Sequence, residues 1–143
     1  MLGGESSGHM FFVERWYGFD DGIYAAGRLA EIISTHGDNL DDAIAKFPAT
    51  SNTPEIIIPV ADDYKFELAK RIINNTDFPS GKVTTLDGLR VDFSNGWGLV
   101  RASNTGPALT ARFEADTLEN LKKIQDEFRT QIAQIDPAIE LNF

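Results

Sequence analysis

The stretch that decides the fold is GLRVDFSNGWGLVRASNTGPALTARFEA, residues 88–115. Apolar and polar side chains alternate along 88–93 and 108–115, which is the pattern of strands that bury one face. Residues 97–102 lie between these segments as a return strand, and the Asn-Gly pair at 95–96 favours a tight hairpin turn before it. The stretch therefore predicts three consecutive strands that pair antiparallel.

The sequence around this stretch supplies a fourth strand and two helices. We expect a strand over 55–61, followed by a helix over 62–75 with Asp62 as its N-cap. A last helix with a regular apolar stripe is expected from Asp116, where Glu119 would complete a capping box. The order β-α-β-β-β-α predicts an α+β fold, in which a four-stranded, mainly antiparallel sheet carries two helices on one face.

A domain boundary is expected at 48–54, PATSNTP, because two prolines there bracket small polar residues. The α+β fold would occupy residues 54–143, which contain every element of the predicted sheet. Residues 1–50 would form a separate part of the chain, which we predict to be the remnant of an α/β domain.

The N-terminal part is predicted to contain a strand over 9–16, a helix over 20–37 that ends at Gly37, and a short helix over 40–47. The Asp20–Asp21 pair lacks further carboxylates at ligand spacing, so we expect it to cap the helix rather than bind a metal. A single strand leaves backbone groups and aromatic side chains uncovered. We therefore expect this part to be less stable than the rest or to self-associate. The aromatic residues at 11–19 are Phe11, Phe12, Trp16, Tyr17 and Phe19.

Composition excludes several classes of function. The chain has 143 residues, a formal net charge of −9 and no cysteine, so disulfides, thiolate metal sites and cysteine nucleophiles are excluded. It lacks the basic footprint of a nucleic-acid binder. The N-terminus has no signal-peptide pattern, and no apolar run approaches the ~20 residues of a membrane span. We expect a cytoplasmic protein with neither a nucleic-acid nor a membrane partner.

Short polar side chains gather between the second and third strands of the opening stretch. Ser103, Asn104 and Thr105 all carry hydrogen-bond donors, and the planar guanidinium of Arg101 fits two phosphate oxygens. Successive backbone N–H groups in such a turn can form an anion-binding concavity. The same composition is also typical of an ordinary turn. The residues alone therefore leave an anion site and a plain turn both open.

A second polar segment, GGESSGH, occupies residues 3–9. The Glu5 carboxylate can accept hydrogen bonds from two neighbouring sugar hydroxyls, and Ser7 can orient a third. His9 titrates near neutral pH and can carry a proton. A flexible glycine turn is the alternative interpretation of the same residues.

Both segments, with the sequence around them, resemble the bacterial phosphomannomutase/phosphoglucomutase group of the α-D-phosphohexomutases. GGESSGH resembles the family's sugar-binding loop, usually written GEMSGH, and RASNTGP (101–107) resembles its phosphate-binding loop, RxSNTxP. The sequence of 11–32 resembles the strand, turn and helix after the sugar-binding loop, and 87–116 resembles the last domain. The resemblance covers essentially the whole chain, with both motifs in the family's order.

The resemblance implies a four-domain isomerase that interconverts hexose 6-phosphate and hexose 1-phosphate, of mannose or glucose. The enzyme would use a phosphoserine, Mg²⁺ and glucose 1,6-bisphosphate. This chain would be the end of the third, sugar-binding domain (1–50) and the whole fourth, phosphate-binding domain (54–143), which closes over the cleft. By resemblance, the substrate phosphate would be held by Arg101, Ser103, Asn104 and Thr105, the sugar hydroxyls by Glu5 and Ser7, and a proton would be carried by His9.

The chain departs from the family pattern at two motif positions, and it lacks two of the family's loops. Ser6 stands where the family usually has Met, and Gly106 where it often has Glu or Thr. The phosphoserine loop and the Asp-rich Mg²⁺ loop have no equivalent, so we expect this chain alone to bind no metal and to be inactive. Its partners would be the phosphosugar and the other domains of the enzyme. The alternatives are a stand-alone phosphosugar-binding module and a protein-interaction domain that uses the aromatic residues at 11–19.

Overall fold

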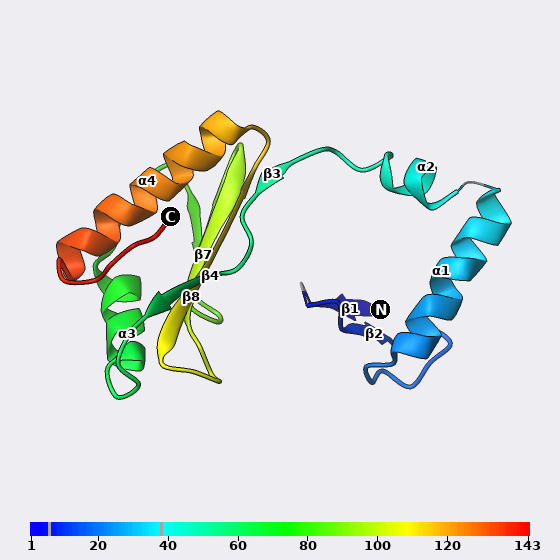
Figure 1. Ribbon diagram of the computed structural model, residues 1–143, viewed down its shortest axis with the longest axis horizontal. Coiled ribbons are helices and arrows are strands. Elements are labelled where there is room, and N and C mark those ends of the chain that lie inside the picture. The colour runs from blue at the N-terminus through cyan, green and yellow to red at the C-terminus, as the bar shows by residue number, and fades with distance from the viewer. Residues whose placement is uncertain (6, 38) are drawn as a thin grey trace. The chain divides into compact units, whose positions relative to one another are not determined.

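The computed structural model describes residues 1–5, 7–37 and 39–143. The chain divides into two compact units, Met1–Pro48 and Ala49–Phe143 (Figure 1). All the described residues that are buried lie in the second unit. Among the described residues, no helix combines the length and the apolar character that crossing a membrane requires.

The first unit contains a small hairpin and two helices. Its elements are β1 (Leu2–Gly4), β2 (Met10–Phe12), α1 (Gly22–His36) and α2 (Leu40–Ile44). The strand predicted over 9–16 is therefore shorter than expected, and it pairs antiparallel with β1, which was expected to be loop. The chain turns after β2, and Arg15 in this turn adopts a left-handed backbone with φ 61°.

The ends of α1 follow the sequence prediction. The Asp21 carboxylate accepts a hydrogen bond from the Tyr24 N–H at 2.9 Å, which caps the first turn. Gly37 adopts φ 69° and its N–H donates to the Ile33 carbonyl, which ends the helix.

The second unit is built on a six-stranded antiparallel sheet. Its strands are β3 (Ser51–Asn52), β4 (Ile56–Pro59), β5 (Lys82–Thr84), β6 (Leu89–Phe93), β7 (Gly96–Ala102) and β8 (Ala108–Ala115). The order is β3-β8-β7-β6-β5, and β4 pairs with another part of β8. The four predicted strands are confirmed and all pair antiparallel. The structure adds β3, within the segment expected to be a linker, and the edge strand β5.

The hairpin between β6 and β7 turns one residue earlier than its Asn-Gly signal suggests. Phe93 pairs with Gly96, so Ser94 and Asn95 form the turn. Gly96 belongs to the strand, where a Cβ would lie 2.3 Å from the Glu114 carbonyl oxygen. This position therefore requires glycine because the neighbouring strand is so close.

Two helices, α3 (Lys65–Asn75) and α4 (Leu118–Ile135), cover one face of the sheet (Figure 1). Alternate residues of β8 are buried against them, including Leu109 and Phe113. A Cβ at Gly98 would lie 2.6 Å from the ring of Phe128, so α4 packs directly on β7. The core residues are Ile58, Leu68, Ile72, Phe78, Leu89, Val91, Val100, Leu109, Ala111, Phe113, Ala115, Leu121, Ile124, Phe128 and Ile132.

The predicted cap of α3 is wrong. The helix begins at Lys65, and its N-cap is Tyr64, whose side chain makes no capping hydrogen bond. Asp62 lies one turn earlier and pairs instead with the Lys65 ammonium at 2.7 Å. The carboxylate thus stabilises the helix start through a side chain rather than through free backbone N–H groups.

The predicted capping box of α4 is also wrong. Thr117 is the N-cap, and its hydroxyl accepts a hydrogen bond from the Asn120 N–H at 3.2 Å. Glu119 is therefore the second helical residue, one position too early to reach back to the cap. It pairs with Lys123 one turn along the helix.

Candidate functional site

The loop between β7 and β8 is closed by its own backbone. The Ser103 N–H donates to the Ala108 carbonyl at 2.9 Å, and the Ala108 N–H donates to the Gly106 carbonyl at 2.9 Å. Because β7 and β8 pair up to Ala102 and Leu109, the sheet fixes both ends of this loop. The loop is thus an ordered turn at the end of two central strands.

The four residues predicted to bind phosphate lie together at this end of the sheet. Arg101 is near the end of β7, and Ser103, Asn104 and Thr105 follow it in the loop. The Ser103 hydroxyl lies 3.3 Å from the Thr105 backbone nitrogen and 3.4 Å from its hydroxyl, which are long and weak contacts. Asn104 and Thr105 are exposed. These side chains therefore present weakly engaged donors to solvent.

A carboxylate that the sequence did not suggest faces Arg101. Asp87 accepts a hydrogen bond from one guanidinium nitrogen of Arg101 at 3.1 Å, and its own side chain is 71% exposed. The next residue, Gly88, has φ 88°, and a Cβ there would lie 2.5 Å from the Arg101 Cβ. The turn before β6 thus packs against Arg101. Because guanidinium carries five N–H donors, this contact leaves others for a ligand.

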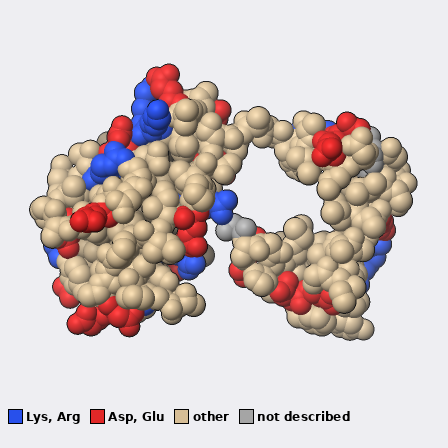
Figure 2. Space-filling view, viewed as in Figure 1, with Lys and Arg blue, Asp and Glu red and all other residues tan. Residues whose placement is uncertain are grey.

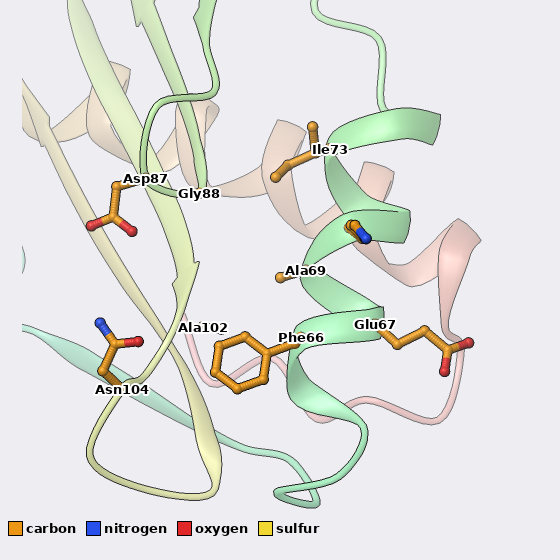
Figure 3. Close-up of a pocket in the computed structure, with 9 residues that line it drawn as sticks. Phe66, Glu67, Ala69, Ile73, Asp87, Gly88, Ala102 and Asn104 are labelled. Carbon is orange, nitrogen blue, oxygen red and sulfur yellow. The ribbon is translucent and has the colours of Figure 1, made fainter.

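A groove of about 520 Å³ runs beside the loop, between α3 and the ends of β6 and β7 (Figure 3). Phe66 and Ala69 line the helix side, and Asp87, Ala102 and Asn104 line the sheet side. The sequence did not predict the groove because its walls come from segments far apart in the chain. It places apolar surface next to the polar loop.

The hairpin loop of the first unit brings together the residues predicted to bind sugar. The Glu5 N–H donates to the His9 carbonyl at 2.9 Å, and the Gly8 N–H donates to the Glu5 carbonyl at 3.0 Å. Gly8 adopts φ 93°, as expected for a glycine turn. The Ser7 hydroxyl donates to the Glu5 carboxylate at 3.1 Å. Ser6, between them, lies outside the described residues.

His9 is held by the carboxylate of Asp20, a residue that the sequence predicts to cap α1. Its Nδ1 lies 2.6 Å from one Asp20 oxygen, and the other oxygen accepts a hydrogen bond from the Met10 N–H at 3.2 Å. Only Asp21 caps α1, so the expectation for the Asp20–Asp21 pair is corrected at its first residue. This geometry orients Nε2 of the ring away from Asp20.

The His9–Asp20 pair shifts the protonation of both groups. The hydrogen bond to Asp20, followed by the charge of its carboxylate, raises the pKa of His9 above its usual value. The hydrogen bond from His9 lowers the pKa of Asp20. The arrangement therefore favours the imidazolium form and stabilises it after a proton is accepted.

Charged side chains elsewhere on the described surface mix both signs. On the face shown in Figure 2, basic side chains are interspersed with acidic ones. Within residues 1–5, 7–37 and 39–143, no three His, Asp or Glu side chains are grouped so that they could hold a metal ion. An anion would therefore be bound by local donors rather than by a broad basic field.

Two family models match the chain, one for each part. The model described as "Phosphoglucomutase/phosphomannomutase, alpha/beta/alpha domain III" matches residues 1–50. The model described as "Phosphoglucomutase/phosphomannomutase, C-terminal domain" matches residues 55–131. Residues 51–54 lie between the two matched segments.

Curated relatives match most or all of the chain. "Phosphomannomutase/phosphoglucomutase" of Pseudomonas putida is 50% identical over 143 residues, which are 100% of this chain and 31% of the relative. "Phosphoglucomutase" of Neisseria gonorrhoeae is 42% identical over 134 residues, or 92% of this chain and 29% of the relative. The chain thus spans less than a third of these relatives.

A solved structure has a similar fold. A phosphoglucomutase/phosphomannomutase family protein from Burkholderia thailandensis aligns with a TM-score of 0.89 and 39% sequence identity. The alignment covers 99% of this chain and 30% of that protein. The fold and the sequence therefore point to the same relatives.

Proposed function

The chain belongs to the phosphoglucomutase/phosphomannomutase family, and from this premise we propose that it is the substrate-binding C-terminal part of a phosphohexomutase. The enzyme would interconvert hexose 6-phosphate and hexose 1-phosphate, of mannose or glucose. We propose that residues 1–50 complete its third domain and that 54–143 form its fourth. The main support is the cluster formed by Arg101 and the donors at 103–105 at one end of the sheet.

In this proposal the loop after β7 binds the phosphate of the substrate. Arg101 supplies one cation, and Ser103, Asn104 and Thr105 supply neutral donors, which suits one phosphate monoester. Hydrogen bonds to a charged group contribute ~1.5–3 kcal/mol each, but an open, solvated loop does not reach their full sum. We therefore expect the chain alone to bind phosphate at about millimolar concentration.

The hairpin loop of the first unit would bind the sugar. The Glu5 carboxylate accepts hydrogen bonds from sugar hydroxyls, and Ser7, which already donates to Glu5, fixes its orientation. His9 accepts the proton of the reacting hydroxyl at Nε2 while its Nδ1 stays bound to Asp20. Asp20 holds the ring and stabilises the imidazolium, so we propose it as the positioning partner of His9.

The remaining chemistry is assigned to other parts of the enzyme. Phosphoryl transfer in this family would require Mg²⁺, which neutralises developing charge on phosphate when bound. The described residues lack a cluster fit to hold that ion, so we assign it, with the phosphoserine and glucose 1,6-bisphosphate, to domains outside this chain. We propose that the chain alone is inactive and that its unit Ala49–Phe143 closes over the substrate and excludes water.

An NMR titration of the chain tests the proposal. Glucose 1-phosphate is added to ¹⁵N-labelled chain, with inorganic phosphate and glucose as controls. We expect amides at 101–106 to shift with both phosphates but not with glucose, and amides at 4–9 to shift only with the sugar phosphate. Arg101→Ala should strongly weaken the first response, so that it no longer saturates, whereas Arg129→Ala, at an exposed ion pair on α4, should leave it unchanged. Unshifted amides at several millimolar ligand would show that the loop in this chain is only a turn.

A further inference from the structure

One buried charge of the second unit lies outside the groups assigned above. Lys65 is 4% exposed and is the only charged residue classed as buried among the described residues. A buried ammonium is costly unless it is paired and hydrogen-bonded. Lys65 has both kinds of partner, because Nζ lies 2.7 Å from Asp62 Oδ1 and 2.8 Å from the Gly106 carbonyl oxygen.

The bond to Gly106 joins the start of α3 to the loop after β7. A second link lies beside it, because the Val60 N–H donates to the Pro107 carbonyl at 3.1 Å. The carbonyls of Gly106 and Pro107 are thus tied to the first residue of α3 and to the residue that follows β4, respectively. Ser103 is held from the other side by Ala108. Between these ties lie Asn104 and Thr105, whose side chains are exposed.

The direction of the Gly106 carbonyl matters for an anion. A carbonyl oxygen that faced the same space as the donors at 103–105 would repel phosphate. Glycine permits the peptide to rotate, and the internal hydrogen bond from Ala108 alone holds this oxygen only weakly. The Lys65 ammonium adds a charge-assisted bond from the interior of the unit. It therefore keeps the acceptor turned inward.

We propose that Lys65 is a positioning residue for phosphate binding, which it supports by holding the Gly106 carbonyl away from the donors of the loop. The inference rests on the proposed function of that loop. Lys65 acts through Gly106 and makes no contact with the ligand itself. The affinity of the loop for phosphate should therefore depend on the buried side chain of Lys65.

The test compares Lys65→Met, Lys65→Arg and a control, Lys122→Met, which removes the same charge from an exposed position on α4. Each chain is titrated with inorganic phosphate by NMR, and amide hydrogen exchange is measured at Ser103 and Ala108. We expect Lys65→Met to raise the phosphate Kd about fivefold or more and to speed exchange at both amides. Arginine can donate to the same carbonyl, so Lys65→Arg should recover most of the affinity, and Lys122→Met should bind as the unchanged chain does.

A measurement on the unchanged chain keeps the test independent of folding in the variants. Because coupling is reciprocal, saturating phosphate should slow solvent exchange of the Lys65 Nζ protons. Unaltered exchange of those protons, or a folded Lys65→Met chain that binds phosphate like the unchanged chain, would overturn the role of Lys65 and leave the proposed function standing. A chain that binds no phosphate, although Lys65→Met loosens the loop, would refute the proposed function and with it the role of Lys65 in binding.

Discussion

Arg101→Ala is the most direct test of the loop as a phosphate site. The guanidinium can offer two charge-assisted hydrogen bonds to one phosphate, each worth ~1.5–3 kcal/mol when both groups are well placed. Two terms reduce this gain. The Arg101 side chain is 35% exposed, so solvent screens the contact, and its bond to Asp87 competes, at ~0.2–1 kcal/mol for an exposed pair. A net loss of about 2 kcal/mol remains, which is about 30-fold in Kd.

The assay is a phosphate titration of the chain followed at the amides of 103–106. A 30-fold loss from about millimolar affinity turns a saturating curve into a linear one over the accessible concentrations. Arg101→Lys keeps the charge but not the planar guanidinium, so its phosphate Kd should lie between those of the unchanged chain and of Arg101→Ala. A saturating curve for Arg101→Ala, with a Kd within twofold of the unchanged chain, would refute the reasoning.

Asp87→Asn should change phosphate affinity in the opposite direction, because it removes the carboxylate that competes with phosphate for Arg101. Removal of this carboxylate frees one guanidinium nitrogen of Arg101 and should tighten phosphate binding by up to about fivefold. The gain should vanish when Arg101 is already alanine, because the carboxylate acts through it. Weaker binding by Asp87→Asn would instead show that the carboxylate orients the guanidinium for the ligand.

Three further outcomes are expected. The ion pair between His9 and Asp20 stabilises the fold fully between pH 3.8 and pH 6.5, the ordinary pKa values of the Asp20 carboxyl and the His9 imidazole. The fold loses this contribution as His9 deprotonates at higher pH. Asp20→Asn should therefore move the NMR titration of the His9 ring to lower pH; an unmoved curve would contradict the pairing. Gly88→Ala forces a side chain to φ 88° and within 2.5 Å of Arg101 and Val100, so urea unfolding should show a loss of about 2 kcal/mol or more. Gly106→Ala, where a Cβ meets nothing within 4 Å, should cost much less, and equal losses would refute the steric argument. Amide exchange should be at least about tenfold faster in Met1–Pro48, where no described residue is buried; uniform protection would contradict this.

The strands and helices that the sequence predicted are those with long regular patterns. β8 alternates over its whole length, and α4 repeats its apolar residues over several turns, so each could be located from sequence alone. β5 has three residues, all exposed, and β3 has only two residues, so both strands are too short for a period to emerge. The strand predicted over 9–16 is too long because the prediction rests on the mostly apolar character of the segment, which does not show where the chain turns. Trp16 instead stacks on Tyr24 at 4.4 Å, beyond the turn at Arg15.

The residues of the candidate site fall into two groups in the same way. Some are close together in the sequence, and others meet only when strands pair or helices pack. Glu5, Ser7 and His9 share one loop, so their proximity follows from the chain itself. The groups that orient the proposed ligand contacts are Asp20, Asp87 and Lys65, and none of them is close in sequence to the residue it serves. Asp87 was within reach of sequence reasoning, because pairing Leu89 with Val100 brings the preceding turn to Arg101. Lys65 was not, since only packing of α3 on the sheet brings its ammonium to the Gly106 carbonyl. The hydrogen-bond donors of such a site can thus be predicted from composition. The contacts that orient these donors can be identified only once the packing of strands and helices is known.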